Sequence, residues 1–204
     1  MNRLFDKLPV IGGKIPGKIT LSFLILLLSV ILLLVNRTTD KLLCMLAMLF
    51  SFIGDVILNR KVGKDKSLVV GGGAFSIAHI FYFFAYNYLI LKCQYAYFNV
   101  GVVISLGIMF AIAIGSIMDA KKASKELAFG VFYLWVSSIN YVTIASYSCS
   151  ANSIASLAAL GALLFLLSDV IIGLEKFANM KSKIMRELVW WLYPIGQIMI
   201  IIFA

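Results

Sequence analysis

Hydrophobic positions along the chain gather into seven long runs separated by short polar loops. The runs lie near residues 19–35, 41–59, 68–91, 97–118, 126–147, 152–174 and 187–204. Each is close to the roughly 20 apolar residues that an α-helix needs to cross a bilayer. The pattern therefore predicts an all-α, polytopic membrane helix bundle of about seven transmembrane helices. Residues 19–204 would form one transmembrane domain, preceded by a basic N-terminal tail at residues 1–18.

The overall composition agrees with a membrane class of protein. The 204 residues are 62% hydrophobic and only 13% charged, whereas soluble domains are about 45–50% apolar and about 25% charged. A transmembrane β-barrel would show short alternating strands instead. The net charge of +9 lies in short loops, so it indicates membrane orientation and contact with membrane lipids, with no nucleic-acid partner expected.

Basic residues alternate between the two sides that successive helices would define. Fifteen lysines and arginines fall in the N-terminal tail and in the second, fourth and sixth loops, and three fall in the other loops. The positive-inside rule then predicts a cytoplasmic N-terminus and an external C-terminus. We expect an integral protein of the bacterial cytoplasmic membrane.

Two carboxylates are set inside these apolar runs. Asp55 lies in SFIGDVIL (51–58), and Asp169 lies in GALLFLLSDVIIGLEKF (161–177). A charge at the centre of a membrane helix costs roughly 3 kcal/mol on insertion scales, so such residues usually face a bundle interior or a watery cavity. Each aspartate could be a hydrogen-bonding anchor of the bundle. Their matched depth, about one turn inside the cytoplasmic ends of their helices, favours a shared site.

The remaining polar side chains of the apolar runs recur at helical spacing. At 1.5 Å of rise per residue, His79 and Gln197 lie roughly 15 Å from the cytoplasmic side. One cavity open to that leaflet is predicted to gather both with Asp55 and Asp169. The candidate residues that would position substrate or water are His79, Tyr82, Asn140, Lys176, Tyr193 and Gln197.

The motifs of several enzyme classes are missing from the sequence. A single histidine argues against a multi-histidine zinc hydrolase, and Cys44, Cys93 and Cys149 show no metal-ligand spacing. There is no GxSxG elbow and no glycine-rich dinucleotide motif. We therefore expect neither a metal nor a cofactor. Two carboxylates in different surroundings suffice for acid–base hydrolysis, with one protonated as the acid and one ionised to activate water.

Four segments in register resemble the YhhN-like membrane proteins, whose characterised members are lysoplasmalogenases. SFIGDVIL (51–58) resembles the S-x-x-GD-x-x-L segment of that family, and residues 71–86 resemble its segment with spaced Phe, His and Tyr. Residues 161–177 resemble its SD-containing segment, and YPIGQ (193–197) resembles the Y-x-x-x-Q of its last helix. The family usually has an extra N-terminal span, which the tail at 1–18 is too short and too polar to form.

The resemblance implies a membrane-embedded hydrolase that cleaves the vinyl ether bond of lysoplasmalogens. The products would be a fatty aldehyde and a glycerophospho-head group, and the partner would be a lysophospholipid. Asp55 and Asp169 would be the catalytic pair. Two alternatives remain open at this stage. One is a lipid or small-molecule transporter that uses the intramembrane aspartates as a proton relay, and the other is a hydrolase of a related lysolipid.

Overall fold

The structure, a computed structural model, describes residues 17–59, 64–93, 104, 106–108, 125–151, 153–180 and 182–204. Its main elements are α1 (Gly17–Asn36), α2 (Thr39–Asn59), α3 (Lys64–Lys92), α5 (Lys125–Ser150), η3 (Ser153–Ala155), α6 (Ser156–Phe177) and α7 (Lys183–Phe203). Six of the described helices are long and apolar enough to cross a membrane. The predicted polytopic helical bundle is therefore confirmed, and the protein is an integral membrane protein.

The helix ends agree with the sequence pattern to within a few residues. The predicted run at 97–118 lies almost wholly outside the described residues. The helix α1 begins at Gly17, so Lys18 belongs to its first turn and not to a preceding tail. After α1 the chain reverses through Arg37, whose φ of 49° is left-handed, and after α6 it turns through Asn179, whose φ is 55°. Asparagine tolerates this conformation at the ends of helices.

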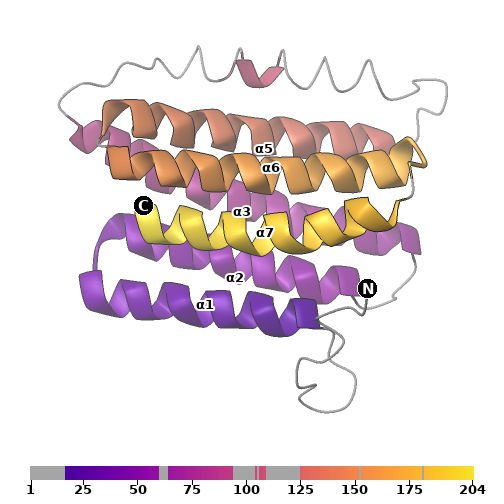
Figure 1. Cartoon of the computed structure of the whole chain (residues 1–204), viewed down its shortest axis with the longest axis horizontal. Helices are drawn as coiled ribbons and strands as arrows, with labels where there is room; N and C mark the ends of the chain where they lie inside the picture. Colours follow the sequence, from indigo (N-terminus) through magenta and orange to yellow (C-terminus); the bar gives the residue numbers. More distant parts are fainter. Residues whose placement is uncertain are drawn as a thin grey trace.

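The described helices pack as a ring (Figure 1). Contacts pass from α1 to α2, then to α3, α5, α6 and α7, and α7 contacts α1 in turn. Figure 1 shows α3 and α5 running in the same direction. This is expected if the chain crosses the membrane once between them, as the sequence predicts. The C-terminal ends of α2 and α6 and the N-terminal end of α1 lie at the same end of the bundle. That end carries both intramembrane aspartates.

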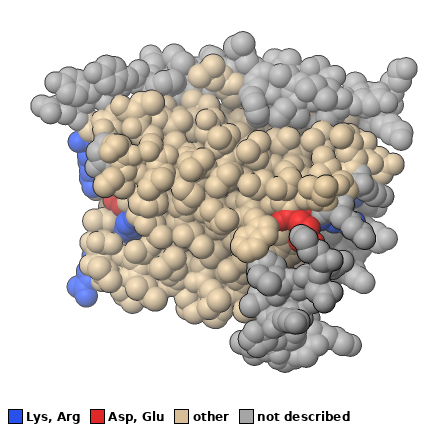
Figure 2. Space-filling model, viewed as in Figure 1, with Lys and Arg blue, Asp and Glu red and all other residues tan. Residues whose placement is uncertain are grey.

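Charged side chains of the described residues lie toward the two ends of the bundle on the face that Figure 2 shows, with an uncharged belt between them. The belt includes exposed apolar side chains of α1 such as Leu24, Ile31 and Leu34. In water an exposed apolar surface of this extent would favour aggregation. In a bilayer it is the surface that faces lipid.

Small residues allow two close approaches that shape the site. A Cβ atom added to Gly196 of α7 would lie 2.7 Å from the carbonyl oxygen of Gly161 in α6, so these two helices meet backbone to backbone. A Cβ atom added to Gly54 would lie 2.6 Å from the ring of Phe75. Gly54 therefore makes room for an α3 ring directly beside Asp55. Such small residues are typical of membrane helix contacts.

Candidate functional site

Asp55 is held by side chains from α1 and α7. Its residue surface is 2% exposed. The hydroxyl of Tyr193 donates a hydrogen bond of 2.7 Å to its Oδ2, and the ammonium of Lys18 lies 3.1 Å from its Oδ1. Apart from this ammonium, Oδ1 has no hydrogen-bond donor among the described residues. A lysine of α1 and a tyrosine of α7 thus meet at one carboxylate of α2.

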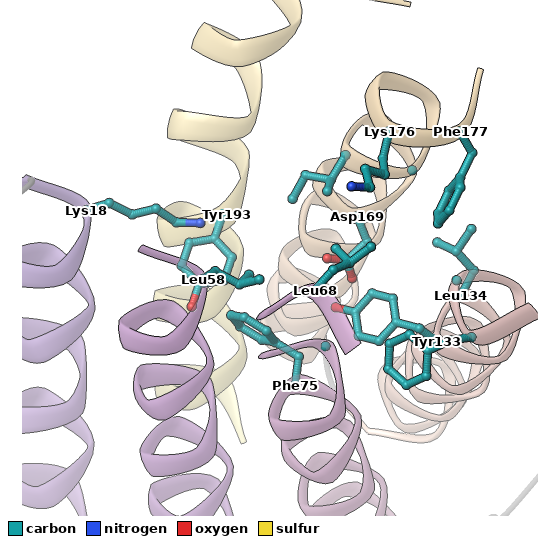
Figure 3. A pocket seen from close by; sticks show the side chains of 15 residues that line it. Lys18, Leu58, Leu68, Phe75, Tyr133, Leu134, Asp169, Lys176, Phe177 and Tyr193 are labelled. Atoms are coloured by element: carbon teal, nitrogen blue, oxygen red, sulfur yellow. The ribbon is translucent and has the colours of Figure 1, made fainter. Parts of the chain in front are cut away.

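Asp169 lies in a different environment, formed by α3, α5 and α6. The hydroxyl of Ser137 donates to its Oδ2 at 2.9 Å, and Nε2 of His79 lies 3.5 Å from the same oxygen. Figure 3 shows the Tyr133 hydroxyl pointing at this carboxylate. Among the described residues no lysine or arginine lies within ion-pair distance of Asp169. Its partners are therefore a histidine and neutral hydroxyls, in contrast to those of Asp55.

His79 connects Asp169 to the interior of α5. Its Nδ1 lies 3.1 Å from Nδ2 of Asn140, and its Nε2 lies 3.4 Å from the Tyr133 hydroxyl. With Asn140 donating to Nδ1, the ring of neutral His79 carries its proton on Nε2, which faces Asp169. The His79 ring also stacks on Phe165 with ring centroids 4.8 Å apart. The histidine is thus oriented from two sides toward the carboxylate.

A third polar group lies deeper in the ring. The Tyr82 hydroxyl donates to Oε1 of Gln197, and Nε2 of Gln197 donates to Ser51 at 3.1 Å. All three residues are fully buried. Because both polar ends of the glutamine amide have partners within this group, it links α2, α3 and α7 to one another. Its hydrogen bonds therefore stabilise the packing of these three helices.

A cavity of about 80 Å³ opens beside Asp169 (Figure 3). A cavity needs roughly 10–15 Å³ by this measure to hold one water molecule, so this one has room for several. Most of its wall is apolar or glycine. The polar side chains on the wall are Lys18, Tyr133, Asp169, Lys176 and Tyr193.

The cavity beside Asp169 does not gather all four of the polar residues that the sequence suggested for one cavity. Of those four, only Asp169 lies on the wall, and Asp55, His79 and Gln197 do not. Asp55 is connected to the cavity through its partners Tyr193 and Lys18. The cause is the rotation of α7 about its axis. The Tyr193 ring faces the cavity, and the Tyr193 hydroxyl points back to Asp55. Asn59, one turn after Asp55, is exposed.

Sequence reasoning missed Lys18 as a site residue. It appeared as the end of a basic tail, because nothing in its neighbours distinguishes it from other loop lysines. The side chain is about one-third exposed, which fits a long side chain that reaches inward from the end of a helix. Ser137 was not among the candidate residues, because small hydroxyl side chains are common at membrane helix contacts, yet it donates a hydrogen bond to Asp169.

The described residues offer no ready metal site. Within them, no three His, Cys, Asp or Glu side chains are grouped so as to hold a metal ion. What the described side chains do offer is acid–base chemistry. They comprise one carboxylate on the cavity wall, a histidine behind it, and a second carboxylate paired with a lysine.

Comparison with known proteins adds one finding. The model of the YhhN family matches residues 17–203, which include every described helix. The search of curated proteins and the search of solved structures return no significant match. The match covers nearly the whole chain and includes both aspartates, and the chain therefore belongs to the YhhN family.

Proposed function

We propose that the protein is a membrane-embedded hydrolase that cleaves the vinyl ether bond of lysoplasmalogens, the alkenyl glycerophospholipids with one chain. The observation that carries the proposal is the placement of Asp169 on the wall of a small, mainly apolar cavity, with Asp55 nearby in an ion pair. The resemblance to lysoplasmalogenases in four segments and the family match over residues 17–203 support it. The site lies at the end of the bundle that the positive-inside rule predicts to be cytoplasmic.

The reaction needs one proton donor and one water molecule. The donor protonates the β carbon of the vinyl ether, and the α carbon becomes an oxocarbenium ion. Water adds to the α carbon and returns a proton to the donor's carboxylate, which gives a hemiacetal. The hemiacetal then collapses to a fatty aldehyde and the free hydroxyl of the glycerophospho-head group. No oxidant, metal or cofactor takes part in this balance.

We assign proton donation to Asp169. It is the carboxylate that can touch a substrate in the cavity, and among the described residues no lysine or arginine lies within ion-pair distance of it. After the proton has left, the new carboxylate stabilises the oxocarbenium ion and then accepts a proton from the attacking water. His79, at 3.5 Å from Oδ2, and Tyr133 are placed to orient that water or to share its proton.

Asp55 is proposed to contribute electrostatically and to hold Tyr193 in position. It pairs with Lys18 and accepts a hydrogen bond from Tyr193, and as an anion it would act in a region of low dielectric constant, where charges interact strongly. The anion also fixes the Tyr193 ring on the cavity wall, where an aromatic face can stabilise a passing cation. The two aspartates are therefore proposed to do different work, in line with their different partners.

The decisive experiment compares ethers that differ by one double bond. Purified protein in detergent is incubated with alkenyl, alkyl and acyl lysolipids that share the same head group, and aldehyde is measured. We expect aldehyde from the alkenyl lipid and little turnover of the alkyl ether, because only the vinyl ether can be protonated at carbon. Equal cleavage of both ethers would rule out this mechanism. Absence of any cleavage would favour the transporter.

A further inference from the structure

Two lysines rim the cavity from opposite sides. Lys18 comes from the first turn of α1, and Lys176 comes from the last turn of α6. Figure 3 shows their side chains pointing toward one another across the space above Asp169 and Tyr193. Both line the cavity. Two ammonium groups that face each other repel, so their arrangement is favoured when an anion lies between them.

The two ammonium groups differ in their carboxylate partners. Among the described residues no carboxylate lies within ion-pair distance of Lys176. Lys18 pairs with Oδ1 of Asp55 at 3.1 Å. An ammonium has three N–H donors, and one carboxylate oxygen uses only one of them. Lys18 can therefore hold Asp55 and a second anion at the same time.

Most of the cavity wall apart from the two lysines is apolar. Leu58, Leu68, Phe129 and Ile172 are among the apolar residues that line the same cavity. A ligand that matches both features carries an anionic group at one end and a hydrocarbon portion next to it. Because the cavity measures about 80 Å³, a long chain would extend beyond it into the lipid, with the segment that joins chain to phosphate beside Asp169.

We infer that Lys18 and Lys176 together bind the phosphate of a single-chain phospholipid at the mouth of the cavity. This inference rests on the proposed function for the identity of the lipid, but the anion site can be tested without any reaction. Bound between the lysines, the phosphate would fix the ether oxygen of the lipid at the depth of Asp169. Lys18 would also connect the bound phosphate to Asp55, so that head-group binding and the second carboxylate share one cation.

The test uses a ligand that the proposed reaction does not consume. Binding of a 1-O-alkyl lysophospholipid to the full chain in detergent is compared with binding of the matching 1-O-alkylglycerol, which lacks phosphate. We expect wild-type protein to prefer the phosphorylated lipid at least about tenfold, which corresponds to about 1.4 kcal/mol. Lys176→Met and Lys18→Met should each lose most of that preference, and Lys176→Arg should retain it because it keeps the positive charge.

Further comparisons decide the outcome. Lys92→Met, which changes a half-exposed lysine at the last position of α3, at the opposite end of the bundle, should leave the preference unchanged. Inorganic phosphate should displace the alkyl lipid only at concentrations at least about 100-fold above those of the lipid, and displacement at equal concentrations would overturn the amphiphile as ligand. If Lys176→Met keeps the full preference, the inference is wrong, and Lys176→Met decides this even where Lys18→Met fails to fold. If the alkyl lysolipid binds in a lysine-dependent way but the alkenyl lysolipid releases no aldehyde, the proposed reaction is refuted and the anion site is still supported.

Discussion

The Tyr193 hydroxyl donates a 2.7 Å hydrogen bond to Oδ2 of Asp55, although 138 residues separate the two in the chain. This bond joins α7 to α2 at the depth of the cavity. The Tyr193 ring lies on the cavity wall while its hydroxyl faces away to the carboxylate. Asp55 therefore acts on the cavity through a neighbour, whereas Asp169 faces it directly.

This difference predicts unequal losses from the two aspartate variants. Asp169→Asn should lower turnover of the alkenyl lysolipid by about 10²–10⁴, the usual effect of losing a positioned acid or base. Asp55→Asn should lower it by about 10²–10³, as expected for a lost charge in a preorganised site. Turnover per folded molecule is the measurement, with folding checked by monodispersity and melting temperature.

Asp40 provides the matched control for these variants. It is also buried, at 5% exposure, but it lies in the first turn of α2, at the other end of that helix from Asp55. Asp40→Asn should keep turnover within about threefold of wild type, which is under 1 kcal/mol of barrier. A variant of Asp55 or Asp169 that keeps more than about a tenth of the wild-type rate would identify that aspartate as a structural anchor.

Tyr193→Phe tests the link between α7 and Asp55. The change keeps the ring and removes the hydroxyl donor, so the carboxylate loses a hydrogen bond of a kind that contributes about 1.5–3 kcal/mol. We expect kcat to fall about 10- to 100-fold. Tyr86→Phe removes a hydroxyl that donates to the carbonyl of Ile200, away from the cavity, so it should lower melting temperature without a comparable loss of kcat. Equal losses of kcat in both variants would contradict the positioning role.

The contact between α6 and α7 predicts a strong effect of one methyl group. Gly196→Ala would place its Cβ 2.7 Å from the Gly161 carbonyl oxygen and 2.9 Å from the Phe165 amide nitrogen. Backbone atoms on α6 can move only with their helix, so we expect destabilisation of about 1–3 kcal/mol, seen as a lower melting temperature in detergent. Gly73→Ala meets nothing within 4 Å and should be neutral or stabilising, since alanine favours helix by about 1 kcal/mol. Indistinguishable melting temperatures would show that α6 and α7 are less closely packed.

The orientation in the membrane can be tested with cysteines. Cys149 is exposed near the end of α5, whereas Cys44 is buried. If the C-terminal end of α5 faces outward, as the positive-inside rule predicts, an impermeant maleimide should label Cys149 in intact cells. A variant with Cys93 and Cys149 replaced and Ala178→Cys introduced after α6 should label only after the membrane is opened. The reverse pattern would invert the topology.

The apolar runs by themselves determined where the described helices lie. In a bilayer each backbone N–H and C=O must be satisfied within its own helix, so the length of an apolar run is enough to place a span. Asp55 and Asp169 were identifiable for the same reason, because a charge in such a run is too costly to face lipid. Both conclusions depend on local sequence and on the solvent alone.

Only the tertiary structure decided which side chains meet. Lys18 pairs with Asp55, and Ser137 with Asp169, because of how each helix is rotated and how closely it approaches its neighbours. Those rotations depend on contacts such as Gly161 against Gly196, between residues far apart in the chain. Helical periodicity places residues on a face but does not say which neighbour that face meets. For this reason the two aspartates looked equivalent in the sequence, and packing alone put one on the cavity wall and the other behind a tyrosine.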